Sequence, residues 1–180
     1  MTSFPPLNDL GRRIMVLGPT NAGKSTLTEA LAERLQAPAI HLDQYRHLPH
    51  TNWVQRPDDA FAALHDAAID QPDWIMDGSY SKLMPQRLRR ATGIIVLDET
   101  LIVRTWRYLR RSMSNKRRPG GLEGHKDGVS RSMLMWLWKT RNASSETRAF
   151  ATRTGLPHVF VHNRSELDAL YAAWHLKRPG

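Results

Sequence analysis

The chain has 180 residues, and its 26 Lys and Arg against 17 Asp and Glu give a formal net charge of +9 at pH 7. The length suits a single domain over residues 1–180, and a content of 41% hydrophobic and 24% charged residues excludes a disordered chain. Cysteine is absent, which excludes disulfide scaffolds and thiolate chemistry; because no apolar run reaches the roughly 20 residues that span a bilayer and no secretory signal begins the chain, we expect a cytoplasmic protein with no membrane partner.

Short apolar segments recur along the chain and predict five buried strands. They cover residues 14–17, 39–42, 74–76, 94–97 and 158–161. Strands that are apolar throughout are typical of a parallel sheet covered on both faces. Helical patterns lie between them, so we expect an α/β fold with a five-stranded parallel sheet and helices on both faces.

Two of the predicted helices are defined by apolar spacing. Each brings three apolar side chains to one face: Leu27, Leu31 and Leu35 after the first strand, and Phe61, Leu64 and Ala68 on a helix over 59–69.

Polar residues at possible N-caps predict three further helices. Thr100 can cap a helix that reaches about residue 113, and Ser130 one that reaches into the 140s or early 150s. Ser165, with Asp168 three residues later, predicts a capping box before a C-terminal helix. The Gly-rich and basic segment 115–128 predicts a mobile loop rather than a domain boundary.

The most specific motif follows the first strand, where residues 18–26 read GPTNAGKST. This is the full phosphate-binding loop pattern, in which glycines let the backbone turn its N–H groups around an anion at a helix N-terminus. Lys24 would reach the β- and γ-phosphates, and the Ser25 hydroxyl would bind Mg²⁺. The predicted nucleotide-binding residues are Gly18, Asn21, Ala22, Gly23, Lys24, Ser25 and Thr26.

A Mg²⁺ site also needs a carboxylate at the end of a neighbouring strand. Asp77 follows the apolar residues 74–76, and we favour it as the metal ligand. Asp98, after the strand at 94–97, is the alternative, although it precedes a predicted helix start where a carboxylate has a plain capping role.

Basic residues concentrate in the second half of the chain. Residues 101–180 carry 16 basic and 5 acidic side chains, and 7 of the 15 residues from 104 to 118 are basic. Arg107 and Arg111 share a helix face with Arg104, where their guanidinium groups could neutralise the charge of a transferring phosphoryl group. The alternative is a solvated surface helix with scattered arginines.

Taken together, these motifs resemble the P-loop small-molecule and nucleoside monophosphate kinases, the adenylate-kinase-like group, and within it the bacterial DNA topology modulation (FlaR-like) kinases. The residues that carry the resemblance are 18–26, 42–43, 52–53, 77–80, 97–98, Arg87, Arg107 and Arg111. The resemblance implies ATP as the phosphate donor, Mg²⁺ as a cofactor, strand order 2-3-1-4-5, an acceptor-binding segment at about 43–70 and a basic lid at about 104–128. The family motif Asp-Gly-Phe-Pro-Arg is here Asp-Gly-Ser-Tyr at 77–80, so the acceptor stays open among a nucleoside, a nucleotide and another hydroxyl compound.

Asp43 bears on this choice because it follows the predicted second strand. A phosphate acceptor is already anionic, whereas a hydroxyl acceptor must lose a proton, which a carboxylate can take. Hydroxyl-phosphorylating relatives carry an acid here, so Asp43 favours a hydroxyl acceptor; the alternative is that it caps the next segment or holds Mg²⁺ through water. Arg46 and Arg87 could bind an acidic group on the acceptor, and each is equally explained by packing. The same holds for three aromatic residues that could stack on a base or sugar: Tyr45, Trp53 and Tyr80.

The remaining histidines and tryptophans have simpler interpretations. The spacing of His41, His47, His50 and His65 matches no metal-ligand pattern, and we expect His65 to pack beside the apolar face of its helix. Core or helix packing is the simplest interpretation of Trp106, Trp136, Trp138 and Trp174, with base stacking as the alternative.

Two classes of function remain open. The favoured one is an ATP-dependent phosphotransferase in which Lys24, Asp43, Arg107 and Arg111 are catalytic. The other is an NTP-binding protein that uses its basic half on nucleic acid backbones. A GTPase fits less well because the guanine-reading motif Asn-Lys-x-Asp is absent.

Overall fold

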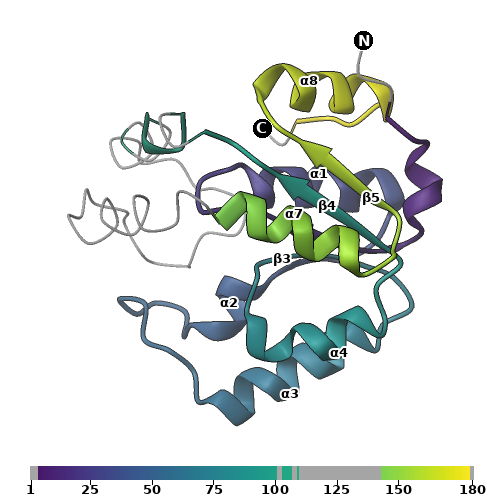
Figure 1. Cartoon of the computed structure of the whole chain (residues 1–180). Coiled ribbons are helices and arrows are strands. Elements are labelled where there is room, and N and C mark those ends of the chain that lie inside the picture. Colours follow the sequence, from purple (N-terminus) through teal and green to yellow (C-terminus); the bar gives the residue numbers. More distant parts are fainter. Residues whose placement is uncertain (1–3, 101–102, 107–108, 110–142, 179–180) are drawn as a thin grey trace.

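A computed structural model describes residues 4–100, 103–106, 109 and 143–178, and its centre is a five-stranded parallel sheet (Figure 1). The strands are β1 Arg13–Leu17, β2 Ala39–His41, β3 Trp74–Asp77, β4 Gly93–Leu97 and β5 His158–Val161. Their order in the sheet is β2-β3-β1-β4-β5, and every neighbouring pair is parallel. The predicted α/β fold and strand order are therefore confirmed.

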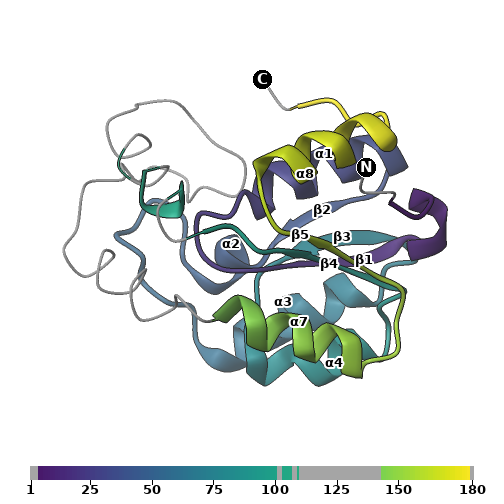
Figure 2. The same cartoon turned by 45° about the horizontal axis from the view of Figure 1, so that its top comes forward.

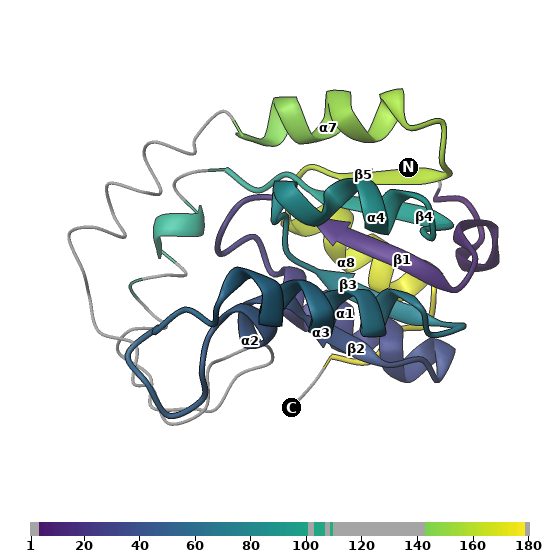
Figure 3. The same cartoon turned by 90° about the horizontal axis from the view of Figure 1, so that it is seen from below.

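Helices cover both faces of this sheet, as predicted. Beside the strands lie η1 Leu7–Leu10, α1 Lys24–Leu35, α2 Leu42–Arg46, α3 Asp58–Ile69, η2 Ser81–Leu83, α4 Met84–Leu88, α7 Ala143–Arg153 and α8 Arg164–Ala173. Figure 2 shows α1 and α8 on one face, and Figures 2 and 3 show α3, α4 and α7 across the other. Among the described residues, no helix is long and apolar enough to cross a membrane.

Alternation along β1 divides the core into two clusters. Ile14 and Val16 belong to the cluster beneath α1 and α8, whereas Met15 and Leu17 belong to the cluster beneath α3, α4 and α7. Successive residues of a strand point to opposite faces, so a strand buried on both sides must be apolar at every position. All four side chains have relative exposures of 0 or 1%.

The buried face of α3 differs from the prediction. Leu64 is 40% exposed, whereas His65 is fully buried together with Phe61, Ala68 and Ile69. From Phe61, positions four, seven and eight residues later lie on one helix face, and this set includes residue 65 in place of 64. The prediction for Leu64 was wrong because it followed hydrophobicity alone; the buried His65 ring has a 2.9 Å contact from Nδ1 to Asp66 Oδ1.

The predicted capping box of the C-terminal helix is also wrong by two residues. The N-cap of α8 is Asn163, whose side chain accepts a 2.9 Å hydrogen bond from the Glu166 N–H. The Glu166 carboxylate in turn accepts a 2.8 Å hydrogen bond from the N–H of His162, the residue before the N-cap. Ser165 lies inside the first turn of α8, because Asn163 is the last residue with extended backbone.

Several predictions concern segments that lie partly or wholly outside the described residues. The Arg104 N–H donates a 3.0 Å hydrogen bond to the Thr100 carbonyl, as expected for a helix that starts there. The helix α7 ends at Arg153, within the range predicted for the helix from Ser130, but the predicted start of that helix lies outside the described residues. Trp174 is buried, but Trp106 is 58% exposed, so packing in the core was wrong for Trp106. The segment 110–142, with most of the predicted lid, Trp136 and Trp138, lies outside the described residues.

Candidate functional site

The turn between β1 and α1 has a conformation that requires glycine at its two ends. Gly18 has φ +135°, and a Cβ atom there would lie 2.2 Å from the Leu97 carbonyl oxygen at the end of β4. Gly23 has φ +100° and is the N-cap of α1. Only glycine adopts such backbone freely and lets main chain approach main chain so closely. The loop is thereby pressed against the carboxyl edge of the sheet.

Lys24, the first residue of α1, folds back across this loop. Its Nζ donates a 2.9 Å hydrogen bond to the Pro19 carbonyl. Burial lowers the pKa of Lys24 and the charge of Arg104 lowers it further, while Asp77 and Asp43 act in the opposite direction. The charges of two carboxylates and one guanidinium therefore act on the Lys24 ammonium group at the loop.

The amino end of α1 faces the same loop and has no side-chain cap. Ser25 and Thr26, which were predicted to bind nucleotide, form its first turn and are partly exposed, and Asn21 has a left-handed φ of +65°. An uncapped helix start combines N–H donors with the positive end of the helix dipole, and both favour an anion.

Arg104 is buried and hydrogen-bonded to the same loop. Its side chain is 1% exposed, and Nε donates a 2.8 Å hydrogen bond to the Thr20 carbonyl. Burial lowers the pKa of Arg104. The sequence placed Arg104 on a basic face with Arg107 and Arg111, but these two lie outside the described residues.

Asp77 contacts a buried histidine, which in turn contacts a partly exposed glutamate. His41 Nδ1 is 2.9 Å from Asp77 Oδ2, and His41 Nε2 is 2.9 Å from Glu29 Oε1 on α1. Burial acts to lower the pKa of His41, but the hydrogen bonds and charges of Asp77 and Glu29 outweigh it, so the pKa is raised. The imidazole thus holds the Asp77 carboxylate in one orientation.

Asp98, the alternative metal ligand, is engaged differently. Its Oδ2 pairs with the Arg148 guanidinium of α7 and lies 3.4 Å from His162 Nδ1. The Asp98 N–H also donates a 2.7 Å bond to the Val161 carbonyl. Asp98 therefore links β4, β5 and α7, with its charge balanced by an arginine.

Asp43 and Tyr80, both predicted to bind the acceptor, are hydrogen-bonded to each other. The Tyr80 hydroxyl donates a 2.6 Å hydrogen bond to Asp43 Oδ1, and burial, followed by the charge of Asp43, raises the pKa of Tyr80. Asp43 is exposed and lies in the first turn of α2, because β2 ends at His41 and not at residue 42 as predicted. Tyr80 has a left-handed φ of +35° and packs edge-on against Phe61, with ring centroids 5.1 Å apart.

Arg87 is hydrogen-bonded to the main chain of the turn that contains Tyr80. It is fully buried, and its guanidinium donates to the main-chain carbonyls of Gly78, Ser79 and Tyr80. Burial lowers the pKa of Arg87 to about 10. The sequence predicted contact with an acidic group of the acceptor; the structure instead has this guanidinium holding the turn after β3.

Arg46 and Trp53 lie farther out on the predicted acceptor segment. Arg46 donates 2.6 Å hydrogen bonds to Asp58 and to Gln55, with its guanidinium 5.4 Å from the centre of the Phe61 ring. The Trp53 ring packs edge-on against His47 at 5.0 Å. Arg46 is thus held in an ion pair, and Trp53 in a ring contact.

The sequence missed the contacts of His41 with Asp77 and with Glu29, although the strand order contained a signal for the first of them. Once β2 is placed beside β3, the last residues of the two strands, His41 and Asp77, fall opposite each other in register. Glu29 gave no such signal, because its contact depends on how α1 crosses β2. Among the described residues no group of three His, Asp or Glu could hold a metal ion without other ligands.

Comparison with known proteins adds nothing to this geometry: neither a model of a known protein family nor a curated protein matches the chain.

Proposed function

We propose that the chain is a P-loop kinase, a phosphotransferase that moves the γ-phosphate of ATP to the hydroxyl group of a small molecule with Mg²⁺ as cofactor. The observation that carries the proposal is the loop from Gly18 to Gly23, pressed on the Leu97 carbonyl and crossed by Lys24. A loop of this shape between a strand and an uncapped helix is built to bind phosphate.

The charges around the loop support a triphosphate in particular. Lys24 would exchange its bond to the Pro19 carbonyl for phosphate oxygens, and Arg104 is bonded to the loop through Thr20. Burial that lowers the pKa of Lys24 disfavours its charged form, and a bound anion offsets this penalty. Phosphate binding and the lysine charge should therefore be linked.

Ser25 and Asp77 are the residues that would hold Mg²⁺. The described residues lack a cluster of three ligands, which suits a cation that takes one carboxylate and completes its shell with phosphate oxygens and water. When bound, Mg²⁺ would neutralise charge on the β- and γ-phosphates. Asp77 fits better than Asp98, whose carboxylate is paired with Arg148.

Asp43 supports a hydroxyl acceptor. In the proposed step the acceptor O–H gives its proton to the Asp43 carboxylate, the acceptor oxygen bonds to the γ-phosphorus, and the bond from that phosphorus to the β–γ bridging oxygen breaks to leave ADP. The Tyr80 hydroxyl donates to Asp43 Oδ1 at 2.6 Å and so orients the carboxylate, whose Oδ2 would take the proton of the acceptor.

Removal of the Lys24 ammonium tests the proposal. We expect Lys24→Ala to abolish ADP release and to weaken Mg-ATP binding in calorimetry by at least about a hundredfold. Lys82→Ala is the matched control, because the Lys82 side chain is 87% exposed and pairs only with Asp58 in the described part of the chain. Appreciable kinase activity in a folded Lys24→Ala variant would refute the proposal.

A further inference from the structure

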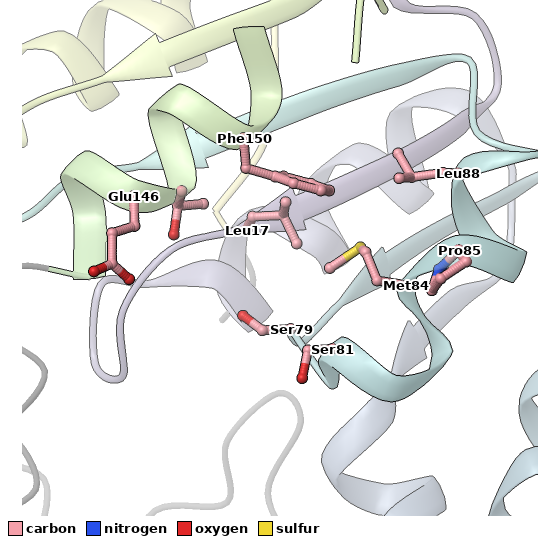
Figure 4. Close-up of a pocket in the computed structure, with 9 residues that line it drawn as sticks. Leu17, Ser79, Ser81, Met84, Pro85, Leu88, Glu146 and Phe150 are labelled. Atoms are coloured by element: carbon pink, nitrogen blue, oxygen red, sulfur yellow. The ribbon is translucent and has the colours of Figure 1, made fainter. Parts of the chain in front are cut away.

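A cavity of about 430 Å³ lies between α4 and α7, beneath the end of β1 (Figure 4). Its walls are mostly apolar, with contributions from Leu17, Met84, Leu88 and Phe150. Sites of this volume with apolar walls and a few polar groups are typical of small-molecule binding.

The cavity adjoins the candidate site through the backbone. Leu17 directly precedes Gly18, and Ser79, also in the lining, is two residues from Asp77 and next to Tyr80. In Figure 4, Glu146 and Ser79 lie toward the loop after β1, whereas Leu88 and Pro85 lie at the opposite end. A ligand in this cavity would have a polar end near the phosphate-transfer site and an apolar end away from it.

The charge of the lining points to a ligand without an anionic group. Glu146 is the one charged residue among the described residues that line the cavity. The two arginines that the sequence offered for an acidic acceptor, Arg46 and Arg87, are bonded to Asp58 and to main-chain carbonyls. A phosphate or carboxylate here would face a carboxylate and lose water without a described cation to compensate.

We propose that this cavity holds the ring of a neutral, nucleoside-like acceptor: a flat heteroaromatic body on a hydroxyl-bearing part. The inference rests on the proposed kinase function and narrows its acceptor. The ring packs on Phe150 and Met84, its N–H groups donate to Glu146, and the hydroxyl end extends toward Asp43. Both Asp43, which suits an acceptor that must lose a proton, and Glu146, which opposes an anion, favour a nucleoside over its monophosphate.

Matched pairs of ligands test this assignment. We would measure binding of adenosine against AMP and of thymidine against thymidine monophosphate by calorimetry, on the full chain without ATP, with glycerol as a neutral ligand that has no ring. At least one nucleoside should bind about tenfold or more tightly than its own monophosphate and than glycerol. Tighter binding of both monophosphates, or no binding of either nucleoside, would overturn the inference.

Two variants tie the binding to the cavity. Leu88→Trp fills the apolar end and should weaken nucleoside binding by at least about tenfold. Ala169→Trp, at an exposed position of α8 on the other face of the sheet, should leave nucleoside binding unchanged. Glu146→Gln removes the charge at the mouth and should lower the ratio of monophosphate to nucleoside dissociation constants about threefold. Equal binding by all three variants and the unmodified protein would place the ligand elsewhere and overturn the inference.

The outcome also separates this inference from the proposed function. Mg-ATP binding that depends on Lys24, together with no nucleoside binding, would leave the kinase in place and remove the acceptor assignment. Nucleoside binding that depends on Leu88, with no binding of Mg-ATP, would remove the kinase and with it the role of the nucleoside as acceptor.

Discussion

Gly18 lies where the surrounding main chain leaves no room for a side chain. A methyl group there would meet the Leu97 carbonyl oxygen at 2.2 Å and would also require an L-residue at φ +135°. We expect Gly18→Ala to lower the free energy of unfolding by about 3 kcal/mol or more, from strain and main-chain displacement together.

Gly155 provides the matched control for Gly18. Its φ is +71°, but a Cβ atom there would meet nothing within 4 Å. Gly155→Ala should therefore cost only the left-handed backbone strain, about 1 kcal/mol. Urea unfolding of both variants measures the difference, and equal losses would show that contact with Leu97 does not restrict the loop.

The two buried histidines should give stability opposite dependences on pH. The raised pKa of His41 means that the folded state holds its proton more tightly than the unfolded chain, where His titrates near 6.5. Its contribution is therefore full below about pH 6.5 and is lost as pH rises through the folded pKa. His65, whose pKa is lowered mainly by burial, contributes stability that is lost as pH falls below about 6.5.

Substitution of each histidine should remove its own part of the profile. We expect His41→Gln to flatten the fall in unfolding free energy on the alkaline side, and His65→Gln to flatten the fall on the acid side. Urea unfolding from pH 5 to 9 measures both. If His41→Gln left the alkaline limb unchanged, the contacts of His41 with Asp77 and Glu29 would not hold a proton.

At the scale of single residues, the sequence predicted the position of a candidate side chain in the fold wherever a local pattern carried the information. Lys24 and Ser25 follow from a motif, and Asp77 follows from its place at a strand end. The partners of Arg87 and Arg46 could not be predicted in this way, because the sequence does not distinguish an arginine that binds a ligand from one that binds a carboxylate or main-chain carbonyls. Their contacts to Gly78 and Asp58 depend on turns that no local pattern specifies.

Among the elements, α8 gives the sharpest comparison of two caps. Asn163→Ala should lower the free energy of unfolding by about 1 kcal/mol, since it removes the acceptor of the Glu166 N–H. Ser165→Ala, at the position that the sequence favoured, should change it by less than about 0.5 kcal/mol. Chemical denaturation distinguishes them, and a larger loss for Ser165→Ala would reverse the assignment of the cap.

Strands were predicted better than helix faces for a physical reason. A strand buried on both sides is apolar at every position, so its existence does not depend on which face is inside. A helix face is decided by its neighbours: α3 packs His65 inward and leaves Leu64 40% exposed. In α8 the cap depends on where the backbone leaves its extended form, and Asn, Ser and Asp all occur within that stretch.

For the molecule as a whole, one sheet shared by two hydrophobic clusters predicts cooperative unfolding. Trp174 belongs to the cluster under α1 and α8, and Trp74 to the cluster under α3, α4 and α7. Because β1, β3 and β4 contribute side chains to both clusters, we expect neither to survive without the other.

Tryptophan fluorescence can follow the two faces separately. One variant would keep only Trp74 and the other only Trp174, with the remaining tryptophans changed to Phe. Within each variant, the urea midpoint from fluorescence should coincide with the urea midpoint from circular dichroism, which follows the whole fold. Separate midpoints within one variant, by fluorescence and by dichroism, would show two units instead of one domain.

Leu17 connects the cavity to the phosphate-binding loop of the proposed site. Its side chain lines the cavity by α4 and α7, and the next peptide begins the loop that rests on Leu97. A ligand in the cavity that displaces Leu17 would also move Gly18. An anion that orders the loop would in turn change the position of Leu17 in the cavity wall. Each ligand would then alter the affinity of the other by the same factor, with the peptide between Leu17 and Gly18 as the connection.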